Sequence, residues 1–330
     1  MHRALALAAA PGVPPGPNPR VGCVLLDSTG TTRSEGWHRG AGTPHAEVDA
    51  LARAGEAARG ATAVVTLEPC NHVGRTGPCS EALVAAGVAR VVYAQSDPHA
   101  IAAGGAERLR AAGIDVEGAV LAEEASAINE AWTFAVTQGR PLVTWKVAAT
   151  LDGRVAAADG TSRWITGEPS RAQVHDLRSD VDAIAVGTGT VLADDPHLTA
   201  RDGAGGLQAW QPLRVVIGMS DVPPRSRVLD DAAPTIHLRT HDPAAALEEL
   251  QAREVRHLLL EGGPTLAAAF LRAGVVDRVT WYVAPAILGA GHAAVADLGI
   301  ATLARAIRLT EVRVDQVGAD ARIRGRVEGA

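Results

Sequence analysis

A histidine and two cysteines near the start of the chain have the residue types and the spacing of a metal site. Glu47 stands two residues after His45, and Cys70, which follows a proline, stands nine positions before Cys79. One imidazole nitrogen and two thiolates can hold a zinc ion and leave its fourth position open for water, as in catalytic zinc sites. A carboxylate beside such a water can accept and return protons. These four residues therefore predict a zinc site that activates water.

The order His-x-Glu, then Pro-Cys, then a second cysteine is typical of zinc enzymes that remove an amino group from a nucleobase. In that pattern two residues separate the cysteines, whereas eight separate them here. The predicted reaction is the hydrolytic deamination of an aminopyrimidine-type ring, with Glu47 as the proton shuttle. The alternative is that these side chains are ordinary core and surface residues, but the complete set in the right order favours the metal site.

Three predicted elements must position these residues. The spacing of apolar residues predicts a helix over residues 45–58, with the histidine and the glutamate in its first turn. An apolar run of strand length over residues 63–67 ends just before the first cysteine, and a helix is predicted over residues 79–87. Two helix N-termini would thus meet at the end of one strand. Cys23 has no candidate ligand beside it and is expected to be a buried apolar residue.

The rest of the first half alternates between predicted strands and helices. This alternation predicts a mostly parallel central sheet with helices on its faces. The further elements expected are strands over 20–26, 31–38, 90–94 and 114–117 and helices over 1–10, 104–113 and 123–137.

Composition and charge narrow the function classes. A chain of 330 residues suggests two domains at about 150 residues each, and the break Gln138-Gly139-Arg140-Pro141 places them at 1–139 and 140–330. The net charge of −6 offers a nucleic-acid backbone little attraction. No stretch is apolar over the roughly 18 residues that a membrane helix needs. The three cysteines imply no disulfide framework, so we expect a protein of the reducing cytoplasm. Because neither nucleic acid nor membrane is indicated, we expect a small-molecule substrate.

The second half holds the single lysine of a chain with 31 basic residues. Lys146 lies in the middle of a strand predicted over 142–149. Because a guanidinium does not easily replace a compact ammonium, Lys146 is a candidate functional residue; the alternative is a remnant of an arginine-rich composition. Gly262-Gly263 follows a buried strand and opens a predicted helix, where backbone N–H groups could hold a pyrophosphate. A set of purely structural tight turns is the alternative.

Motifs in both halves are shared with one known family. In the first half they are Pro17-Asn18-Pro19-x-Val21-Gly22-Cys23, Gly36-x-His38, His45-Ala46-Glu47 and Glu68-Pro69-Cys70 with Cys79. In the second half they are Lys146, Leu151-Asp152-Gly153-Arg154, Trp164-Ile165-Thr166-Gly167, Gly187-Thr188-Gly189-Thr190-Val191-Leu192 with Asp194-Asp195-Pro196, and Glu261-Gly262-Gly263-Pro264-Thr265. With these motifs the chain resembles the bifunctional deaminase/reductase family of riboflavin biosynthesis over nearly its full length.

The resemblance implies an α/β protein with an N-terminal cytidine-deaminase-like α/β/α domain and a C-terminal dihydrofolate-reductase-like α/β domain. The first domain would use zinc to deaminate 2,5-diamino-6-(5-phosphoribosylamino)pyrimidin-4(3H)-one. The second would use NADPH to reduce the ribosyl group of that product, giving 5-amino-6-(5-phosphoribitylamino)uracil. We also expect a homo-oligomer, either a dimer or a tetramer.

The family's motifs imply roles for individual residues. Catalytic roles fall to Glu47, Lys146 and Glu261, and zinc would be held by His45, Cys70 and Cys79. NADPH would contact Ala148, Trp164, Thr190, Asp194, Gly263, Pro264 and Thr265. The substrate would contact Asn18, Ser162, Arg178, Leu198, Arg201 and Glu261. Arg178 and Arg201 suit the 5′-phosphate because a guanidinium fork matches phosphate oxygens.

The chain departs from the family's usual residues at Val73, Gly77, His99 and Gly218, none of them a predicted metal ligand. Asn18, His72 and His99 could contact substrate or belong to loop structure. Three rival hypotheses remain open: a nucleoside or single-stranded-DNA deaminase joined to an unrelated domain, a zinc-stabilised binding module without activity, and a family member that retains only the reductase. The acidic balance and the reductase-like half argue against the first.

Overall fold

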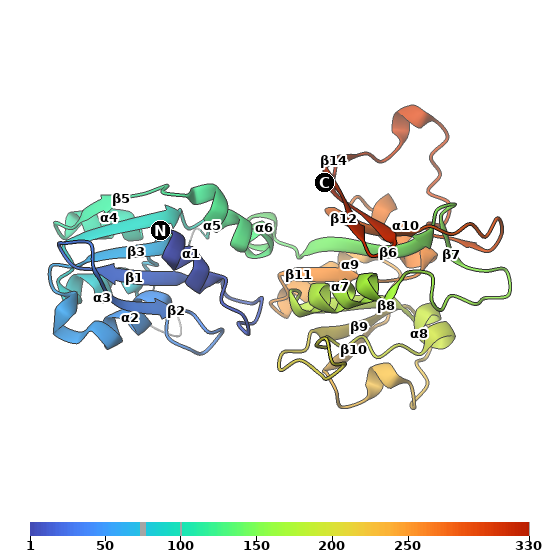
Figure 1. Ribbon diagram of the computed structural model, residues 1–330, viewed down its shortest axis with the longest axis horizontal. Helices are drawn as coiled ribbons and strands as arrows, with labels where there is room; N and C mark the ends of the chain where they lie inside the picture. Colours follow the sequence, from blue (N-terminus) through green and yellow to red (C-terminus); the bar gives the residue numbers. More distant parts are fainter. Residues whose placement is uncertain (73–76, 100, 330) are drawn as a thin grey trace. The chain divides into compact units, whose positions relative to one another are not determined.

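The computed structural model describes residues 1–72, 77–99 and 101–329, so Val73 lies outside the described residues. The chain divides into two compact units, Met1–Gly139 and Arg140–Ala330. Each unit has its own main sheet (Figure 1). Each also has its own hydrophobic core. Within the described residues, no helix has the length and apolar character required to span a membrane.

The first unit is built on a five-stranded mixed sheet with the order β2-β1-β3-β4-β5. Strands β3, β4 and β5 are parallel, as expected, but β1 runs antiparallel to both β2 and β3. The expectation of a mostly parallel sheet is therefore wrong for this edge, because the short turn over 27–31 can join only antiparallel strands. The strands are β1 Gly22–Leu26, β2 Thr32–Trp37, β3 Thr62–Leu67, β4 Arg90–Gln95 and β5 Asp115–Glu117.

The helices of the first unit differ from expectation at one place. The helix predicted over 123–137 is two helices, because Asn129 interrupts it. The Asn129 Oδ1 accepts the Arg20 backbone N–H at 2.8 Å and its Nδ2 donates to the Arg20 carbonyl at 2.9 Å. The helices are α1 His2–Ala8, α2 Ala46–Ala54 with a 3-10 turn at Gly55–Ala58, α3 Cys79–Ala86, α4 Gly105–Ala111, α5 Ala122–Ile128 and α6 Glu130–Gln138.

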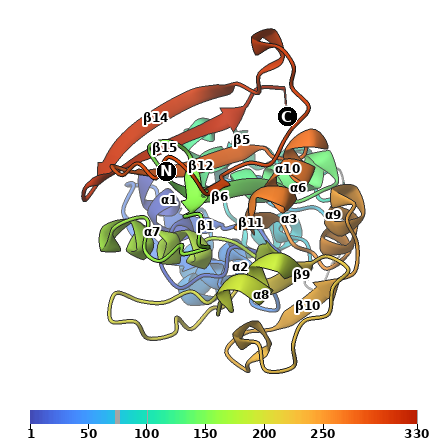
Figure 2. The same cartoon turned by 90° about the vertical axis from the view of Figure 1, so that its right-hand side faces the viewer.

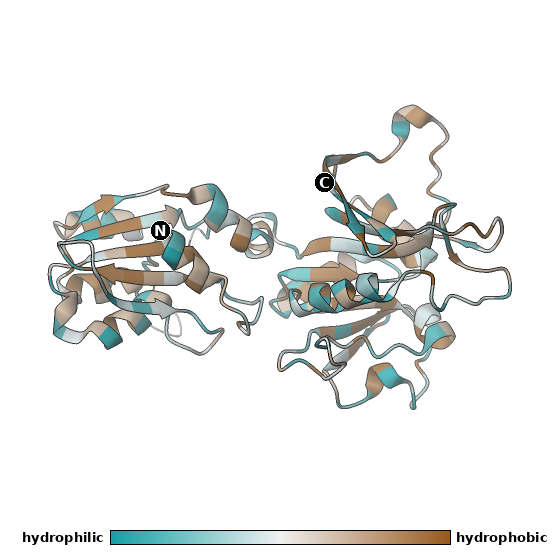
Figure 3. Cartoon of the chain, viewed as in Figure 1, coloured by the Kyte–Doolittle hydropathy of each residue, from teal (hydrophilic) through white to brown (hydrophobic). Residues whose placement is uncertain are grey.

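Helix α2 lies directly on strand β2 because Gly36 has no side chain. A Cβ at Gly36 would come within 2.3 Å of the Ala46 carbonyl and 2.4 Å of the Ala50 nitrogen. This close approach fixes the helix that carries the predicted proton shuttle. Cys23 on the neighbouring strand is fully buried, as expected. In Figure 3, β1 and β3 are largely hydrophobic along their length, which matches their place inside the unit.

The second unit is built on an eight-stranded sheet with the order β10-β9-β8-β11-β6-β12-β15-β14. The first six of these strands are parallel, and the long hairpin of β15 and β14 adds an antiparallel edge (Figure 2). The strands are β6 Leu142–Thr150, β8 Ala183–Gly187, β9 Leu213–Ile217, β10 Thr235–Leu238, β11 His257–Leu260, β12 Arg278–Ala284, β14 Leu309–Val317 and β15 Asp320–Val327, and β7 Arg154–Ala156 pairs separately with β13 His292–Ala293.

Parallel strands place their carboxyl ends at one edge of the sheet, where ligands of such folds bind. Glu261 follows the last residue of β11 directly, and α8 begins at Thr188 directly after β8. Helix α9, which the sequence reading did not include, starts where the Asp242 side chain accepts the Ala244 backbone N–H at 2.9 Å. The helices are α7 Glu168–Ser179, α8 Thr188–Asp194, α9 Pro243–Ala252 and α10 Pro264–Arg272, with 3-10 turns at Arg227–Leu229 and Leu303–Arg305.

Candidate functional site

The three predicted metal ligands of the first unit lie together. The Nδ1 of His45 is 3.2 Å from the Cys79 sulfur and 3.6 Å from the Cys70 sulfur. All three ligand atoms lie within 4.8 Å of one another. Ligands at tetrahedral Zn–S and Zn–N distances would be separated by about 3.6 Å. The donor set and its spacing therefore fit a zinc ion.

Local structure holds each ligand in place. His45 is the N-cap of α2 with an extended backbone, so it precedes the first turn of the helix instead of lying in it. Cys70 follows β3, and its sulfur accepts the backbone N–H of Cys79 at 3.4 Å, where α3 begins. The ends of two helices and one strand thus converge on the three atoms.

The pKa values of the two metal-site thiols are shifted in opposite directions. A hydrogen bond from Cys79 lowers the pKa of Cys70 to about 4, with further help from His45. The same bond, together with burial, raises the pKa of Cys79 well above its usual value. The two sulfurs hold one proton less than two neutral thiols would, and a thiolate is the form that binds metal. The negative charge of the Cys70 thiolate would also attract a metal cation.

Glu47 lies on α2, two residues after the histidine, and only 4% of it is exposed. Burial raises the pKa of Glu47 to about 7. A carboxyl group with a pKa near neutrality can both accept and release a proton at the working pH. The sequence-predicted shuttle therefore occupies a site that suits that role.

Asn18 is held by His38, the histidine of the Gly36-x-His38 motif. The Asn18 Nδ2 lies 3.0 Å from the His38 Nε2, while the His38 Nδ1 lies 3.0 Å from the Pro44 carbonyl oxygen. Because the carbonyl can only accept, Nδ1 carries the proton and Nε2 accepts from the amide. The Asn18 Oδ1 consequently remains as the acceptor end of this side chain. The ring of His38 also meets that of His45 edge-on, at 5.4 Å between centroids.

The loop that contains His99 is tied to the strand before Cys70 by Glu68. The Glu68 carboxylate accepts the backbone N–H groups of Asp97 at 3.3 Å and Ala106 at 3.0 Å. His99 itself donates its backbone N–H to Asp97. Its side chain and that of His72 are partly buried, and neither contacts a predicted ligand through a hydrogen bond in the described segments.

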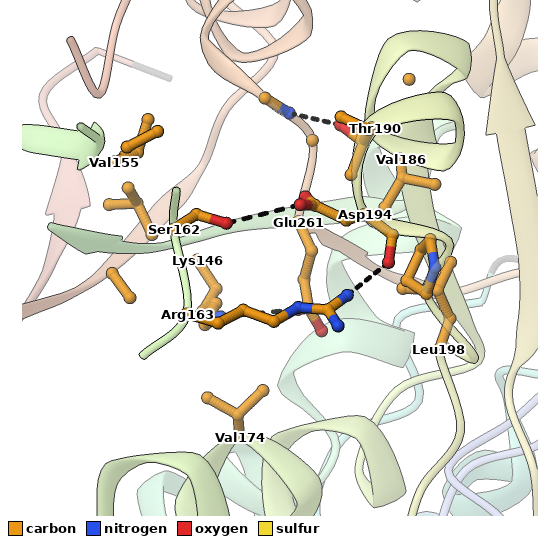
Figure 4. Close-up of a pocket in the computed structure, with 18 of the residues that line it drawn as sticks. Lys146, Val155, Ser162, Arg163, Val174, Val186, Thr190, Asp194, Leu198 and Glu261 are labelled. Atoms are coloured by element: carbon orange, nitrogen blue, oxygen red, sulfur yellow. Dashed lines mark hydrogen bonds and ion pairs between the residues drawn. The ribbon is translucent and has the colours of Figure 1, made fainter. Parts of the chain in front are cut away.

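A cavity of about 900 Å³ lies in the second unit. Its lining comes from the second half of β6, the end of β8, helices α7 and α8 and the loop over 160–166 (Figure 4). The start of α10 also contributes to it. It brings together every predicted site residue of this half of the chain: Lys146, Ala148, Ser162, Trp164, Arg178, Thr190, Asp194, Leu198, Arg201, Glu261, Gly263, Pro264 and Thr265.

Glu261 is the centre of a charged cluster in this cavity. The Arg178 Nε and Nη2 donate to its two carboxylate oxygens at 2.7 and 3.0 Å, and the Lys146 Nζ lies 3.5 Å from Oε2. Burial by itself would raise the pKa of Glu261, but the charges of Arg178 and Lys146 lower it to about 2. The carboxylate is therefore ionised at neutral pH. Two nitrogens of the Arg178 guanidinium, which is expected to contact the phosphate, are bound to this carboxylate.

The loop over 160–166 closes one side of the cavity. The Arg163 guanidinium donates to the Asp194 carbonyl, and the Ser162 hydroxyl lies 3.4 Å from the Asp194 carboxylate (Figure 4). Trp164 is exposed for 69% of its surface, and the Arg171 guanidinium lies 4.6 Å from its ring centroid. An exposed indole at a cavity rim provides a flat surface for an aromatic or sugar ring.

One backbone N–H group of the glycine turn before α10 is already hydrogen-bonded to a neighbouring hydroxyl group. The Thr190 Oγ1 accepts the Gly263 backbone N–H at 3.2 Å. A phosphate at this helix start would therefore bind N–H groups that follow Gly263, with Thr190 beside it.

The segment that contains Leu198 is fixed by a buried arginine on β9. Arg214 is fully buried, and its Nη1 donates to the Asp230 carboxylate at 2.7 Å and to the His197 carbonyl at 3.3 Å. Leu198 itself has a left-handed backbone with φ of 53°. Such a conformation persists where surrounding contacts enforce it, and the arginine is one of them.

Sequence reasoning missed His175, which also lines the cavity. It stands three residues before Arg178 on α7, so both side chains lie on one helix face. That spacing on a predicted helix was a signal that could have identified it.

Each of the two units matches the model of a known protein family. Residues 141–323 match the model of the RibD C-terminal domain, and residues 1–95 match that of the cytidine and deoxycytidylate deaminase zinc-binding region. The Mycobacterium tuberculosis riboflavin biosynthesis protein RibD is 52% identical over 92% of this chain and 89% of its own length. The Escherichia coli protein of the same name is 40% identical over 97% of this chain and 96% of its own length.

Two solved structures have a similar fold over nearly the whole chain. Acinetobacter baumannii RibD superposes with a TM-score of 0.91 at 37% identity, covering 99% of this chain and 97% of that one. A Thermotoga maritima diaminohydroxyphosphoribosylaminopyrimidine deaminase/5-amino-6-(5-phosphoribosylamino)uracil reductase gives a TM-score of 0.89 at 32% identity with the same coverage.

Proposed function

The chain belongs to the RibD family of riboflavin biosynthesis proteins, and we propose that its two units act in sequence on one phosphoribosylated pyrimidine. Proteins of this family are bifunctional, with a zinc-binding deaminase domain and a reductase domain. The observation that carries the proposal is the clustering of each predicted residue set: a His-Cys-Cys-Glu group in one unit and a single cavity with all the reductase candidates in the other. The alternative of a deaminase fused to an unrelated domain is wrong, because the second unit matches the same family.

The first unit would deaminate 2,5-diamino-6-(5-phosphoribosylamino)pyrimidin-4(3H)-one. His45, Cys70 and Cys79 would hold a zinc ion, which supplies the Lewis acidity that makes water nucleophilic near neutral pH. Glu47 would take the proton from the attacking water and deliver it to the departing amino group. Its pKa of about 7 supports both transfers at the same pH. The Asn18 Oδ1, oriented by His38, would accept a hydrogen bond from the pyrimidine.

The second unit would reduce the ribosyl group of the deaminated product. NADPH, held along Trp164, Thr190 and the turn after Gly263, would supply a hydride for the sugar C1′. The C1′–O bond must break as C1′ is reduced, and the ring oxygen then needs a proton. Lys146 would donate it, and Glu261 would hold the ammonium in position through the contact at 3.5 Å. Lysine is the residue of choice because its ammonium can release a proton, whereas a guanidinium does not.

The 5′-phosphate would bind Arg201 instead of Arg178. The Arg178 fork is taken up by Glu261 and its remaining nitrogen donates to the Thr199 carbonyl at 3.1 Å. Arg201 donates through Nε to Thr199 Oγ1 and through Nη1 to the Gly205 carbonyl. Within the described ranges its Nη2 makes no hydrogen bond, and Arg201 lines the cavity. Arg178 would then serve the reaction by fixing the carboxylate that positions Lys146.

We further propose that the enzyme works in the cytoplasm as a homo-oligomer. Three free cysteines, two of them at the metal site, suit a reducing compartment. Val312 and Val314 are exposed on the edge strand β14 and offer an apolar surface to a second copy. Light scattering of the purified protein measures its mass, and a monomer at micromolar concentration would contradict this part of the proposal.

The two activities can be tested on one purified sample. We expect bound zinc, ammonia release from the diaminopyrimidine substrate, and NADPH oxidation that follows ammonia release with this substrate but begins at once with the deaminated product. Ammonia release from cytidine or single-stranded DNA, with none from the phosphoribosylated substrate, would replace the proposed substrate class. NADPH oxidation without ammonia release, in a zinc-loaded sample, would leave only the reductase function.

A further inference from the structure

His175 lies beside the charged cluster of the second unit without belonging to it. It stands one turn before Arg178 on α7 and lines the cavity. Its Nδ1 lies 3.2 Å from the Thr199 carbonyl oxygen, which also accepts the Arg178 Nη1 at 3.1 Å. One backbone carbonyl therefore anchors both side chains. A carbonyl oxygen has two lone pairs, so it can accept both hydrogen bonds at once.

This contact determines the tautomer of His175. A carbonyl cannot donate, so the hydrogen bond requires the ring proton on Nδ1. Burial, followed by the nearby charge of Arg178, lowers the pKa of His175 below its ordinary value, which favours the neutral ring. The Nε2 atom of a neutral Nδ1–H imidazole carries a lone pair and can only accept. Within the part of the chain that the structure describes, this Nε2 makes no hydrogen bond to a protein group.

The cavity is rich in donors, and its carboxylates are already engaged. Glu261 binds Arg178 and Lys146, and Asp195 binds the backbone and side chain of Arg227. The carboxylate of Asp194, which also lines the cavity, lies 3.4 Å from the Ser162 hydroxyl. A sugar with several hydroxyl groups needs acceptors as well as donors when it leaves water. The Nε2 of His175 is an acceptor that no protein group uses, on the helix face that carries Arg178.

We propose that His175 is a substrate-recognition residue of the reductase site, whose Nε2 accepts a hydrogen bond from a hydroxyl group of the sugar. This inference rests on the proposed reduction of a ribosyl group. It predicts selectivity for hydroxylated sugars, because an analogue without that hydroxyl would leave the acceptor unpaired. The residue would act on substrate binding more than on hydride transfer, since it does not contact Lys146 or Glu261 through a hydrogen bond.

Two substitutions separate the two nitrogens. His175→Asn retains an N–H group that can reach the Thr199 carbonyl but removes any atom at the Nε2 position. His175→Gln places an amide oxygen near Nε2 and restores an acceptor. The matched control is His241→Asn, at an exposed position that does not line the cavity. Each variant would be assayed with the deaminated ribosyl substrate and with its 2′-deoxy and 3′-deoxy analogues, and the Kd of each would be measured by calorimetry without nucleotide.

We expect His175→Asn to raise KM and Kd about tenfold with kcat within about twofold, as the loss of one hydrogen bond implies. His175→Gln should recover most of the affinity, and His241→Asn should match the wild type. The wild type should discriminate about tenfold against one deoxy analogue, and His175→Asn should not discriminate between the ribosyl compound and that analogue.

The proposal is overturned if His175→Asn retains wild-type affinity, or if it still discriminates against both analogues as the wild type does. Equal losses for every analogue, with a lowered melting temperature and no recovery in His175→Gln, would indicate a structural role and also overturn it. A wild-type protein that neither binds nor reduces the ribosyl compound would instead overturn the proposed reductase function, and this inference with it.

Discussion

Asp320 and Ser170 are hydrogen-bonded across 150 positions of the chain, with the serine hydroxyl donating to the Asp320 Oδ2 at 2.6 Å. The same oxygen accepts the backbone N–H of Gly167, the N-cap of α7, at 2.8 Å. Asp320 is the first residue of β15. The C-terminal hairpin therefore supplies the cap for the helix that carries His175 and Arg178. A carboxylate at a helix N-terminus is favoured both by the free N–H groups and by the helix dipole.

Removing this cap should weaken the reductase site. We expect Asp320→Ala to lower the free energy of unfolding of its unit by about 2 kcal/mol and to raise the reductase KM, because α7 loses its fixed start. Deamination should be unchanged. Asp242→Ala, which removes the cap of α9 outside the cavity, is the control and should lower stability by about 1 kcal/mol without changing reductase kinetics. Urea unfolding and steady-state kinetics measure both effects, and equal kinetics for the two variants would contradict the prediction.

Glu47→Gln should stop deamination while the metal site stays intact. The amide has nearly the shape of the carboxyl group but cannot take a proton from water, so ammonia release should fall by at least about 10²-fold. Zinc content, measured by atomic absorption, should equal that of the wild type, and NADPH oxidation on the deaminated substrate should persist. Glu81→Gln, at an exposed position on α3, is the control. Ammonia release at the wild-type rate would exclude Glu47 as the shuttle.

The three cysteines should differ in their effect on zinc. Cys70→Ser and Cys79→Ser should each lose zinc and deamination, since a hydroxyl is a poor zinc ligand. They should also lower the melting temperature of the deaminase unit, because a metal that binds only the folded state stabilises it. Cys23→Ala is the matched control, because Cys23 is a buried cysteine that does not belong to the ligand group. Full zinc loading in Cys70→Ser would contradict the assignment of that ligand.

Lys146→Arg should damage reduction alone. A guanidinium at this position keeps a positive charge beside Glu261 but does not release a proton readily, so the reductase kcat should fall by about 10²-fold or more. Deamination, in the other unit, should be unaffected. NADPH oxidation followed at its absorbance maximum is the measurement, with Arg278→Lys on the neighbouring strand as control. Wild-type reduction in Lys146→Arg would mean that the single lysine is an accident of composition.

His257 should make the free energy of unfolding depend on pH. Burial, followed by the charge of Arg278, lowers the pKa of His257 from 6.5 to about 4, and its Nε2 lies 2.8 Å from the Thr144 hydroxyl. Between these two values the unfolded chain binds a proton that the folded chain does not, so stability falls as the pH is lowered from 6.5 toward 4. The loss should reach up to about 3 kcal/mol. His257→Gln should flatten this part of the urea-unfolding profile, and an identical slope in both proteins would contradict the assignment.

The metal site could be predicted from sequence because each of its three ligands lies at the end of a helix or strand. His45, Cys70 and Cys79 each stand at the end of an element that apolar spacing reveals, and their chemistry follows from residue type. The same holds for Lys146 on its strand. Short-range patterns determine these elements, so neighbours in the sequence carry the information.

The hydrogen-bond partners of these side chains were decided by the tertiary structure. The sequence predicts Arg178 as a phosphate ligand, and the fold in addition brings it against Glu261, 83 positions away, where two charge-assisted hydrogen bonds join the two side chains. The break at Asn129 depends on Arg20, and the cap of α7 depends on Asp320. Such pairs form only when distant segments are packed together and their polar groups must find partners away from water. The residue types and the chemistry are thus written in the sequence, whereas the contacts that orient them arise from the packing of the sheet.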